Sequence, residues 1–580
     1  MFLLIVGFAS VVWGEGNRLF AHTLGNSNPQ SVAWFGFSVE GLGDLNGDGV
    51  SDLAVSAPQQ TIDGIAQQGK VVVFSGRDET ELLTITSPFP QMQANFGEVI
   101  AVSDVNDDGI PDLVIGVRLQ DVDEKVDQGE VYIFSGVDGS WLSTIEAPLP
   151  QAAGFFGASV STLNDRGNQN GRAEIIVGSP QQSFDNSDNE GAVFLLSAMT
   201  GELLSIVLHP DPQAGASFGF AVEEVGDLDG DAVPDFIVSA PFQMVAGRVM
   251  QGQVYAFSGG SALFGQDPKH LYTLNFPDPD MPTARFGFAV ASSDDLNGDG
   301  VSDFVVGAPT ADFDHISNQG SAFVFSGADG LLLHILRDPS TDATVLQDAF
   351  FGAALASLGD IDGDGVADIA VGAPAPVSRG DNVLNHGRVL LFSGVNGEHL
   401  LTLDNLAPEA GGSFGFSLSA VGDVTGDSMP DLLTGAPFHN IESGGQSHLA
   451  SGEAFLISGL GPDLKGKIVE AVRTVTASGH DRVSFEVKIK NRGTVRTPIP
   501  FKVKVHISND DVFDGGRLDP RVAKWKVEQS LSPGESITLT GSADFEEAVG
   551  GMFLLIRVDP KNNIVEKREG NNVKAFRILG

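Results

Sequence analysis

Short apolar segments bounded by Gly, Pro or Asp fill the first 460 residues of the chain. One representative stretch contains FGFSVEGLG at 35–43, DLAVSAP at 52–58, KVVVFSG at 70–76 and ELLTI at 81–85. Each segment is rich in β-branched residues or alternates apolar with polar positions, which predicts a β-strand. Four antiparallel strands in about 60 residues form a sheet that cannot bury its faces alone, so neighbouring units must stack.

This unit recurs seven times. Each copy begins with Phe-Gly, continues with an acidic loop and an apolar run ending near Gly-Ala-Pro, and closes with G-x-V-x-x-F-S-G or a variant of it. The Phe residues are Phe35, Phe96, Phe156, Phe218, Phe286, Phe351 and Phe414. Seven sheets of four strands predict an all-β fold, a seven-bladed β-propeller.

The frame of the repeat also predicts how the ring closes. The last unit stops after its third strand, GEAFLISG at 452–459, while RLFAHTL at 18–24 precedes the first Phe-Gly. Residues 18–24 therefore serve as the missing fourth strand, and we expect them to pair with the strand around Glu453 to Ile457. Such pairing locks the ring and removes two sheet edges.

The combination of Phe-Gly, Gly-Ala-Pro and acidic loop, from about Arg18 to Gly459, resembles the FG-GAP repeats of the integrin α-subunit N-terminal propeller. The resemblance implies the same propeller fold and a recognition function. The chain has no Cys and no run of 18 apolar residues, so we interpret it as a relative of that propeller and not as an integrin.

A second domain begins near residue 461. Segments such as RVSFEVKIKN and PFKVKVHIS alternate apolar with charged residues, and turn signals join them, which predicts an immunoglobulin-like β-sandwich. The segments KNRG, LSPGES and VDPKNNIVEKREGNNV resemble the cell-adhesion-related (CARDB) domain of bacterial surface proteins. We expect a spacer or docking module. The predicted domains are a signal peptide at 1–14, the propeller at 15–460 and the sandwich at 461–580.

Composition narrows the possible functions. Lys and Arg number 33 against 76 Asp and Glu, a net charge of −43, which argues against binding nucleic acid. The apolar stretch MFLLIVGFASVVW is too short to span a bilayer and resembles the apolar region of a signal peptide, although it lacks a preceding Lys or Arg. A mis-set start or a buried N-terminal strand are the alternatives. We expect a secreted or cell-surface protein without a transmembrane segment.

The acidic loops follow the pattern D-x-[ND]-x-D-G-x-x-D, which offers oxygen ligands from positions 1, 3, 5 and 9 and a carbonyl from position 7. Oxygen donors in a flexible loop favour Ca²⁺. The four strong sites are Asp44, Asn46, Asp48, Val50 and Asp52; Asp104, Asn106, Asp108, Ile110 and Asp112; Asp295, Asn297, Asp299, Val301 and Asp303; and Asp360, Asp362, Asp364, Val366 and Asp368.

Two further loops depart from the pattern. The fourth replaces the turn Gly with Ala232, and the seventh has Thr425 at position 3 and Ser428 at position 6. Their ligands are Asp227, Asp229, Asp231, Val233 and Asp235, and Asp423, Thr425, Asp427, Met429 and Asp431. The third loop aligns Arg166, Asn168, Asn170 and Glu174 with the ligand positions and is expected to bind no metal. We therefore expect five or six Ca²⁺ ions, which serve structure more readily than chemistry because the cage is closed.

The resemblance directs attention to the propeller face opposite the metal loops as the ligand-binding face. Acidic residues recur there in the variable loops: Asp63, Asp123, Asp185, Asp314 and Glu442. They are either turn carboxylates or an anionic rim. Trp34, Phe155 and Phe350 precede Phe-Gly and are either core residues or exposed contacts for a glycan or protein.

No catalytic motif occurs in the sequence: it contains no G-x-S-x-G, H-E-x-x-H or P-loop. We predict a secreted calcium-binding propeller for recognition or adhesion, with an extracellular protein or glycan as partner, and not an enzyme. The alternative is a polysaccharide-active enzyme that uses an unrecognised carboxylate pair on the propeller. Facing carboxylates with shifted pKa values in a pocket would favour the enzyme, and a shallow aromatic or charged rim would favour binding.

Overall fold

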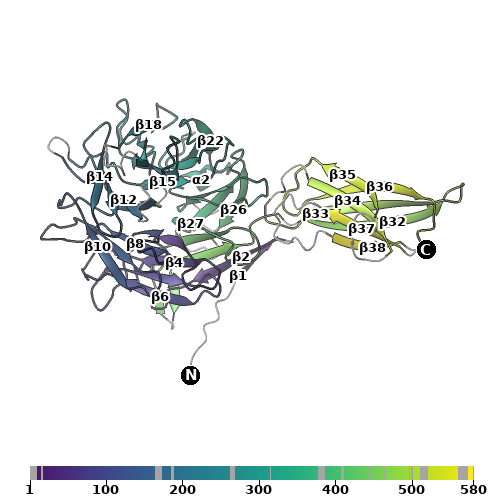
Figure 1. The fold of residues 1–580 in the computed structure, drawn as a ribbon, viewed down its shortest axis with the longest axis horizontal. Helices are drawn as coiled ribbons and strands as arrows, with labels where there is room; N and C mark the ends of the chain where they lie inside the picture. The colour runs from purple at the N-terminus through teal and green to yellow at the C-terminus, as the bar shows by residue number, and fades with distance from the viewer. Residues whose placement is uncertain are drawn as a thin grey trace, which may run out of the picture.

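The computed structural model describes residues 10–14, 17–163, 173–184, 188–260, 268–313, 315–375, 386–405, 411–443, 446–462, 464–495, 497, 501–509, 520–550, 552–558 and 573–578. Over these residues the chain is almost entirely β-structure, with one short helix, α2 (Ala343–Leu346). Figure 1 shows a ring of sheets joined at its rim to an elongated second domain.

Within the described residues the ring consists of six four-stranded sheets and one five-stranded sheet, all antiparallel. We call them blades 1 to 7. Blades 1 to 3 contain β3 (Val39–Gly43), β4 (Asp52–Ala57), β5 (Lys70–Phe74) and β6 (Glu81–Thr86); β7 (Val99–Ser103), β8 (Asp112–Val117), β9 (Glu130–Phe134) and β10 (Trp141–Glu146); and β11 (Ser159–Leu163), β12 (Glu174–Ser179), β13 (Ala192–Ser197) and β14 (Leu203–Leu208).

Blades 4 to 6 repeat the same order. They contain β15 (Val222–Gly226), β16 (Asp235–Ala240), β17 (Gln253–Phe257) and β18 (His270–Asn275); β19 (Val290–Ser292), β20 (Phe304–Ala308), β21 (Ser321–Phe325) and β22 (Leu332–Leu336); and β23 (Ala354–Ser357), β24 (Ile369–Ala373), β25 (Arg388–Phe392) and β26 (His399–Asp404). The first strand of each blade contacts the first strand of the next blade, and β27 (Ser417–Gly422) of blade 7 contacts β3, so the ring is continuous.

Blade 7 is built from both ends of the chain. Its strand order is β1 (Ser10–Gly14), β2 (Asn17–Leu24), β31 (Glu453–Ser458), β28 (Asp431–Ala436) and β27. Phe20 pairs with Ser458 and Leu24 with Ala454, which confirms the predicted closure. β1 forms the outer strand of the sheet, in the segment predicted as a signal peptide. A small hairpin, β29 (Ile441–Ser443) and β30 (Gln446–His448), projects from the loop between β28 and β31.

The Phe-Gly motif joins one blade to the next. All seven Phe side chains are fully buried, and Phe96 forms a parallel bridge with Gly69 of the preceding blade. Phe35 makes the same bridge with Gly452 of blade 7. A Cβ on Gly69 or Gly452 would overlap the backbone of the bridged Phe, and both residues have a positive φ, so only Gly fits. The repeated motif is therefore the seam between blades.

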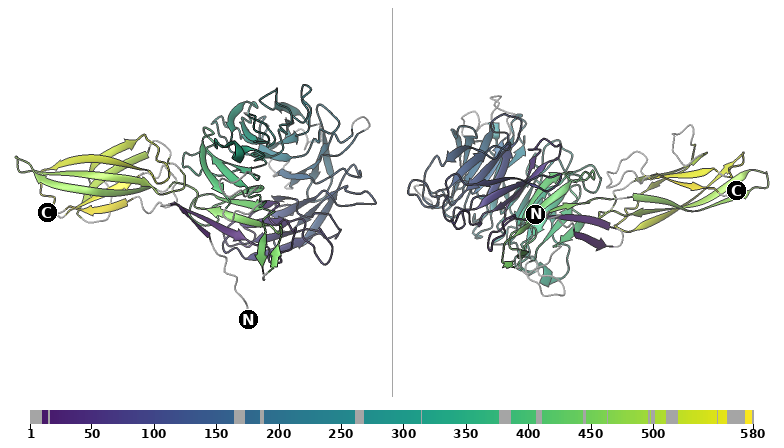
Figure 2. Two further views of the ribbon diagram at one scale, coloured as in Figure 1. Left: turned by 180° about the vertical axis from the view of Figure 1, so that it is seen from behind. Right: turned by 90° about the horizontal axis from the view of Figure 1, so that it is seen from below.

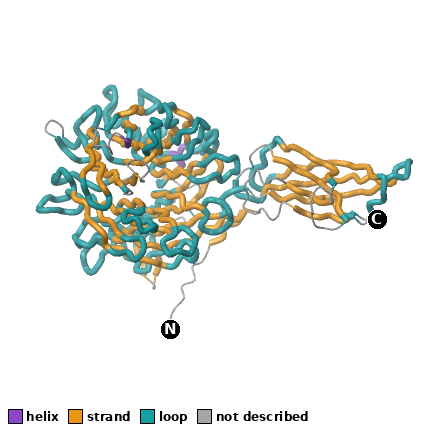
Figure 3. The backbone as a smooth tube through the Cα atoms, viewed as in Figure 1, coloured by secondary structure: helices purple, strands orange, loops and turns teal. Residues whose placement is uncertain are grey.

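The second domain is a sandwich of two antiparallel sheets with its own core. One sheet has the order β32 (Leu464–Val475), β33 (Asp481–Asn491) and β36 (Ser536–Phe545). The other has the order β35 (Arg521–Val527), β34 (Phe501–Ser508), β37 (Phe553–Val558) and β38 (Val573–Arg577). Alternate residues of β33 are buried, as the period of two predicted. We call this domain the tail; it extends away from the rim of the propeller (Figures 2 and 3).

Candidate functional site

The acidic loops connect the first and second strands of their blades and share one hydrogen-bond pattern. In blade 1 the Asp44 carboxylate accepts bonds from the amides of Gly47, Asp48 and Gly49, at 2.7, 3.0 and 2.7 Å. Asp48 accepts a bond from the Val50 amide at 2.9 Å. These bonds wrap the backbone around the carboxylates.

Positions 4 and 6 have a left-handed backbone in all six loops that the structure describes. Gly47 and Gly49 have φ values of 77° and 87°, and Ala232 and Ser428, which replace Gly at position 6, have φ values of 69°. A non-Gly residue in this region costs energy, so the strain expected at Ala232 is present and Ser428 shares it. The requirement at position 4 was not predicted from the sequence: Gly stands there in five of these loops, and Asp107 stands there in the sixth.

The Asp at position 9 is fully buried in each of these six loops. Its carboxylate fastens the loop to the blade: Asp52 accepts bonds from the Leu45 amide at 2.9 Å and from the Gly76 amide, past the third strand, at 3.1 Å. Burial raises the pKa of Asp235 to about 7 and that of Asp368 to about 8, although the backbone amides that donate to each carboxylate lower its pKa. A buried carboxylate of this kind needs a proton or a cation.

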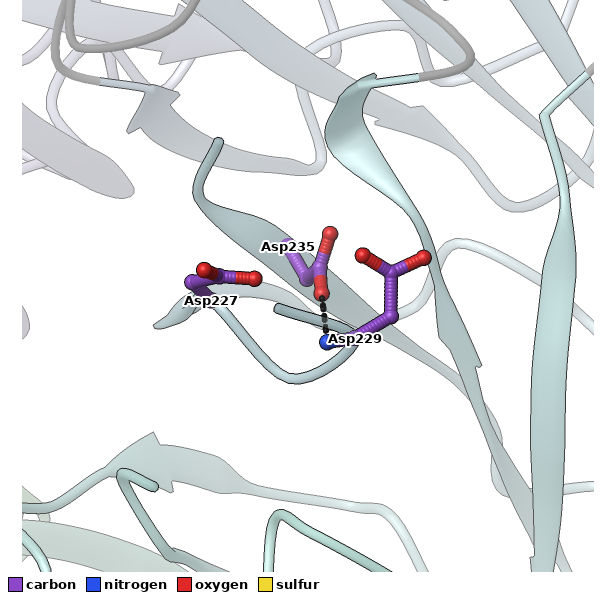
Figure 4. Close-up of side chains that lie close together, drawn as sticks. All are labelled: Asp227, Asp229 and Asp235. Atoms are coloured by element: carbon purple, nitrogen blue, oxygen red, sulfur yellow. Dashed lines mark hydrogen bonds between the residues drawn. The ribbon is translucent and has the colours of Figure 1, made fainter. Parts of the chain in front are cut away.

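The loops of blades 4 and 6 bring three carboxylates within reach of one ion. Oxygens of Asp227, Asp229 and Asp235 lie within 4.8 Å of one another, and so do oxygens of Asp360, Asp362 and Asp368. Figure 4 shows the first group, in which the Asp229 amide donates to Asp235 at 3.2 Å. Loops with Asn at position 3 have one carboxylate fewer at this point.

Basic side chains approach two of the loops. Arg77 pairs with Asp48, at 3.3 Å, in loop 1, and Lys269 pairs with Asp229, at 3.1 Å, in loop 4. In each case the basic side chain forms an ion pair with a predicted metal ligand. A metal ion bound there would compete with the basic side chain for the same carboxylate.

The donor set fits a hard divalent cation. Every side-chain donor is an oxygen, and in blade 7 one oxygen, Asp431 Oδ1, is buried without any hydrogen-bond partner among the described residues. Oxygen-only coordination by Asp, Asn and carbonyl groups is typical of Ca²⁺. The third loop, with Arg166, Asn168 and Asn170, lies outside the described residues; only Glu174, the first residue of β12, is described there.

The opposite ends of the strands carry the variable loops and the residues that precede Phe-Gly. Asp63 and Asp123 are exposed at the tips of two tight turns, each with a positive φ, and Glu442 is exposed on β29. Asp185 and Asp314 lie outside the described residues. Asp63 and Asp123 therefore occupy exposed turn positions, which agrees with both the turn and the rim interpretations.

The aromatic residues before Phe-Gly are half-buried and lie on this second face. Trp34, Phe155 and Phe350 all have a left-handed backbone, with φ values of 59°, 58° and 53°. Trp34 stacks on Phe37 at 5.9 Å and meets Phe438 edge-on at 5.4 Å, while Phe416 contacts both phenylalanines. We call Trp34, Phe37, Phe416 and Phe438 the aromatic cluster.

A cavity of about 770 Å³ is lined by residues of the first strands of blades 1, 4, 5, 6 and 7. Its described lining contains Glu40, Glu223 and Glu224 and no Lys, Arg or His. Burial raises the pKa of Glu40 to about 8, with Glu223 adding repulsion, and burial raises the pKa of Glu223 to about 7. Ser292 Oγ donates to Glu223 at 2.9 Å. Sequence reasoning missed this pair because only ring closure brings blades 1 and 4 to a common axis.

Comparison with known proteins agrees with this geometry. The FG-GAP repeat model matches residues 35–74, 96–134, 224–257, 286–325, 351–384 and 414–449, and the CARDB model matches residues 461–576. The chain therefore carries FG-GAP repeats in its propeller and a CARDB domain at 461–576. The third blade has no match to the repeat model, yet its described residues form a four-stranded sheet like its neighbours.

Three integrin α-subunits are among the similar proteins. Integrin alpha-5 of Xenopus laevis is 33% identical over 230 residues, 38% of this chain and 20% of the relative. Integrin alpha-2 of Mus musculus is 29% identical over 226 residues, 38% of this chain and 17% of the relative. Integrin alpha-E of Homo sapiens is 35% identical over 203 residues, 34% of this chain and 16% of the relative. The match thus covers a fifth or less of each relative's length.

Among solved structures, a CARDB domain from Pyrococcus furiosus, described in complex with di-metal ions, is 28% identical. It covers 20% of this chain and 87% of that chain, with a TM-score of 0.16. Across the described part of the chain, we find no helix with the length and apolar character needed to cross a membrane.

Proposed function

We propose that this chain is an exported, calcium-stabilised recognition or adhesion protein. Its partner is an extracellular protein or glycan, which binds the propeller face opposite the metal loops. The observation that carries the proposal is that the two ends of the propeller differ: the acidic loops lie at one end, and the half-buried aromatic cluster lies at the other. Exposed edges of aromatic rings suit stacking against sugars and packing against apolar side chains. The similarity to integrin α-subunits supports an extracellular setting.

A direct test is an array of glycans and extracellular proteins, probed with the purified chain in millimolar Ca²⁺ and in excess chelator. Trp34→Ala should weaken binding at least tenfold. Trp141 is the matched control, since it is 48% exposed but lies on the outer strand β10. Equal binding by the Trp34→Ala and Trp141→Ala variants would exclude the aromatic cluster as the contact surface.

We propose that the propeller binds five or six Ca²⁺ ions through the ligands given above. The boundary between the propeller and the tail lies at 460/461, and the tail is a docking module. Export would remove residues 1–14 and with them β1, which would leave β2 as the outer strand of blade 7, the place that the fourth strand takes in the other blades. N-terminal sequencing of the secreted chain checks this cleavage.

A second candidate, a polysaccharide-active enzyme, is favoured by one observation: the Glu40 and Glu223 carboxylates, both with raised pKa values, line one cavity. A protonated and an ionised carboxyl group are the components of glycoside hydrolysis. Release of reducing sugars from a polysaccharide panel, abolished by Glu223→Gln, would establish this activity. Absence of release by the wild-type chain would leave binding as the function.

A further inference from the structure

The seventh metal loop differs from the other described loops in how its position-9 Asp is held. In blades 1, 2, 4, 5 and 6 this carboxylate accepts a bond from a Gly amide just past the third strand; the donors are Gly76, Gly136, Gly259, Gly327 and Gly394, at 2.9 to 3.1 Å. In blade 7 the corresponding oxygen, Asp431 Oδ1, is buried and accepts no bond from any described residue. Blade 7 therefore lacks this Gly amide bond, although the side chain of Thr425 bonds to the Asp431 carboxylate.

The missing bond is explained by the path of the chain into the tail. The corresponding glycine, Gly459, has a left-handed backbone with a φ of 75°. Its carbonyl accepts a bond from Thr494 Oγ1 of the tail at 2.9 Å. The turn that leads to the tail thus replaces the contact that fastens the loop in other blades.

A turn of the tail is seated against the same loop. Thr494 exchanges bonds with Gly461: the Gly461 amide donates to Thr494 Oγ1 at 3.0 Å, and the Thr494 amide donates to the Gly461 carbonyl at 2.8 Å. A Cβ on Gly461 would lie 2.5 Å from Cε of Met429, whose carbonyl is the position-7 ligand. Gly461 therefore links the tail turn to the metal loop.

Apolar burial reinforces this contact. Met429, Leu460 and Val495 are each fully buried and belong to one apolar cluster, which lies between blades 6 and 7 and is separate from the core of the tail. At position 7 of the other described loops, Val233 is also buried, whereas Val50, Ile110, Val301 and Val366 keep partial exposure. The tail turn is held in shape by Asn491, whose side-chain amide donates to the Val495 carbonyl at 2.7 Å.

We propose that the tail turn Asn491–Val495 is a structural part of the seventh metal loop, so that cation binding to this loop and docking of the tail are one coupled equilibrium. The inference rests on the calcium binding proposed above. A cation bound by the predicted ligands of this loop, which include Asp423 and Asp431, holds the loop that carries Met429 in the shape that receives Val495. Without the cation, the buried Asp431 oxygen and the neighbouring carboxylates destabilise that shape. By linkage, docking of the tail raises the affinity of this loop for the cation by the same factor.

The chain has no Cys, so two introduced cysteines report the orientation of the tail. Ser140 in blade 2 and Ser478 at a tail turn are exposed and suit labelling with a fluorophore pair. In single-molecule energy transfer, the Ser140→Cys/Ser478→Cys chain should give one narrow efficiency distribution in millimolar Ca²⁺ and a broad one in excess chelator. Bound calcium is counted by titration calorimetry on the same chain.

Matched variants isolate the seventh loop. Asp423→Asn should broaden the distribution in Ca²⁺, whereas Asp295→Asn, the same change at position 1 of loop 5, should leave it narrow. Thr494→Val should also broaden it, while Thr474→Val, on the exposed side of β32, should not. If the chain binds calcium but the energy-transfer distribution is as narrow in chelator as in Ca²⁺, the inference is wrong and the proposed function still stands. If titration detects no bound calcium, the proposed metal sites and this inference both fail.

Discussion

Leu24, near the start of the chain, is paired with Ala454, in the last strand of the propeller. Both residues are almost fully buried, in the apolar cluster that joins blade 7 to blade 1. A ring that is fastened by strands from both ends of the chain cannot open without breaking this pair of strands.

Leu24→Ala should destabilise the propeller by about 2 to 5 kcal/mol, because it removes buried apolar volume at the closure. The midpoint of urea unfolding measures the change. Leu208→Ala serves as the control, since Leu208 also ends an outer strand but is 55% exposed. Similar midpoints for the two variants would contradict a closure role for β2.

Stability should depend steeply on Ca²⁺. From residue 461 onward the sequence has 20 basic and 16 acidic residues, which leaves 13 basic and 60 acidic residues in the first 460. A site that binds only in the folded state contributes about 2.7 kcal/mol when free Ca²⁺ is about 100 times its dissociation constant. Five or six sites would together contribute about 13 to 16 kcal/mol, which is as large as the upper end of the usual net stability of a domain, roughly 5 to 15 kcal/mol.

Calorimetry in millimolar Ca²⁺ and in excess chelator checks this dependence, and an identical melting temperature in both would refute the metal sites. Asp48→Ala, Asp299→Ala and Asp364→Ala should each remove one bound ion. Asn170→Ala, in the third loop, should remove none, and loss of an ion from that variant would contradict the prediction of a metal-free loop.

Lys269 should lower the calcium affinity of loop 4, because its ammonium group pairs with the ligand Asp229. An exposed ion pair of this type is worth about 0.2 to 1 kcal/mol, so Lys269→Met should raise the affinity of that loop by about 1.5- to 5-fold in a calcium titration. Lys526→Met removes a comparable exposed pair, with Glu528 in the tail, and should leave every site unchanged. No change in the Lys269→Met chain would show that Lys269 does not compete with the ion.

The closure strand should respond to pH through His22. The bond from its Nδ1 to Glu79, 2.6 Å long, raises the pKa of His22 above the ordinary 6.5, with partial burial opposing the rise. The pair therefore stabilises the fold fully below about pH 6.5, and this contribution is lost as the pH rises through the raised value. Glu79→Gln should lower the melting temperature at pH 5.5 and have little effect at pH 9. An equal effect at both pH values would exclude protonation of His22 as the cause.

The repeat pattern alone determined the all-β class, the positions of the acidic loops and the pairing of residues 18–24 with the last propeller strand. These follow from sequence because strand period, turn glycines and ligand spacing are local properties that each unit repeats. The CARDB domain was also recognisable from its turns, which are short contiguous segments.

Only the tertiary structure decided which residues from different units meet. Glu40 and Glu223 share a cavity because blades 1 and 4 face a common axis, and Trp34 meets Phe438 because the last blade adjoins the first. Asp431 lacks the Gly amide partner found in other blades where the chain turns into the tail at Gly459, and Val495 lies in the apolar cluster between blades 6 and 7. Such contacts join residues far apart in the chain, and no local pattern records which of many compatible surfaces will be brought together.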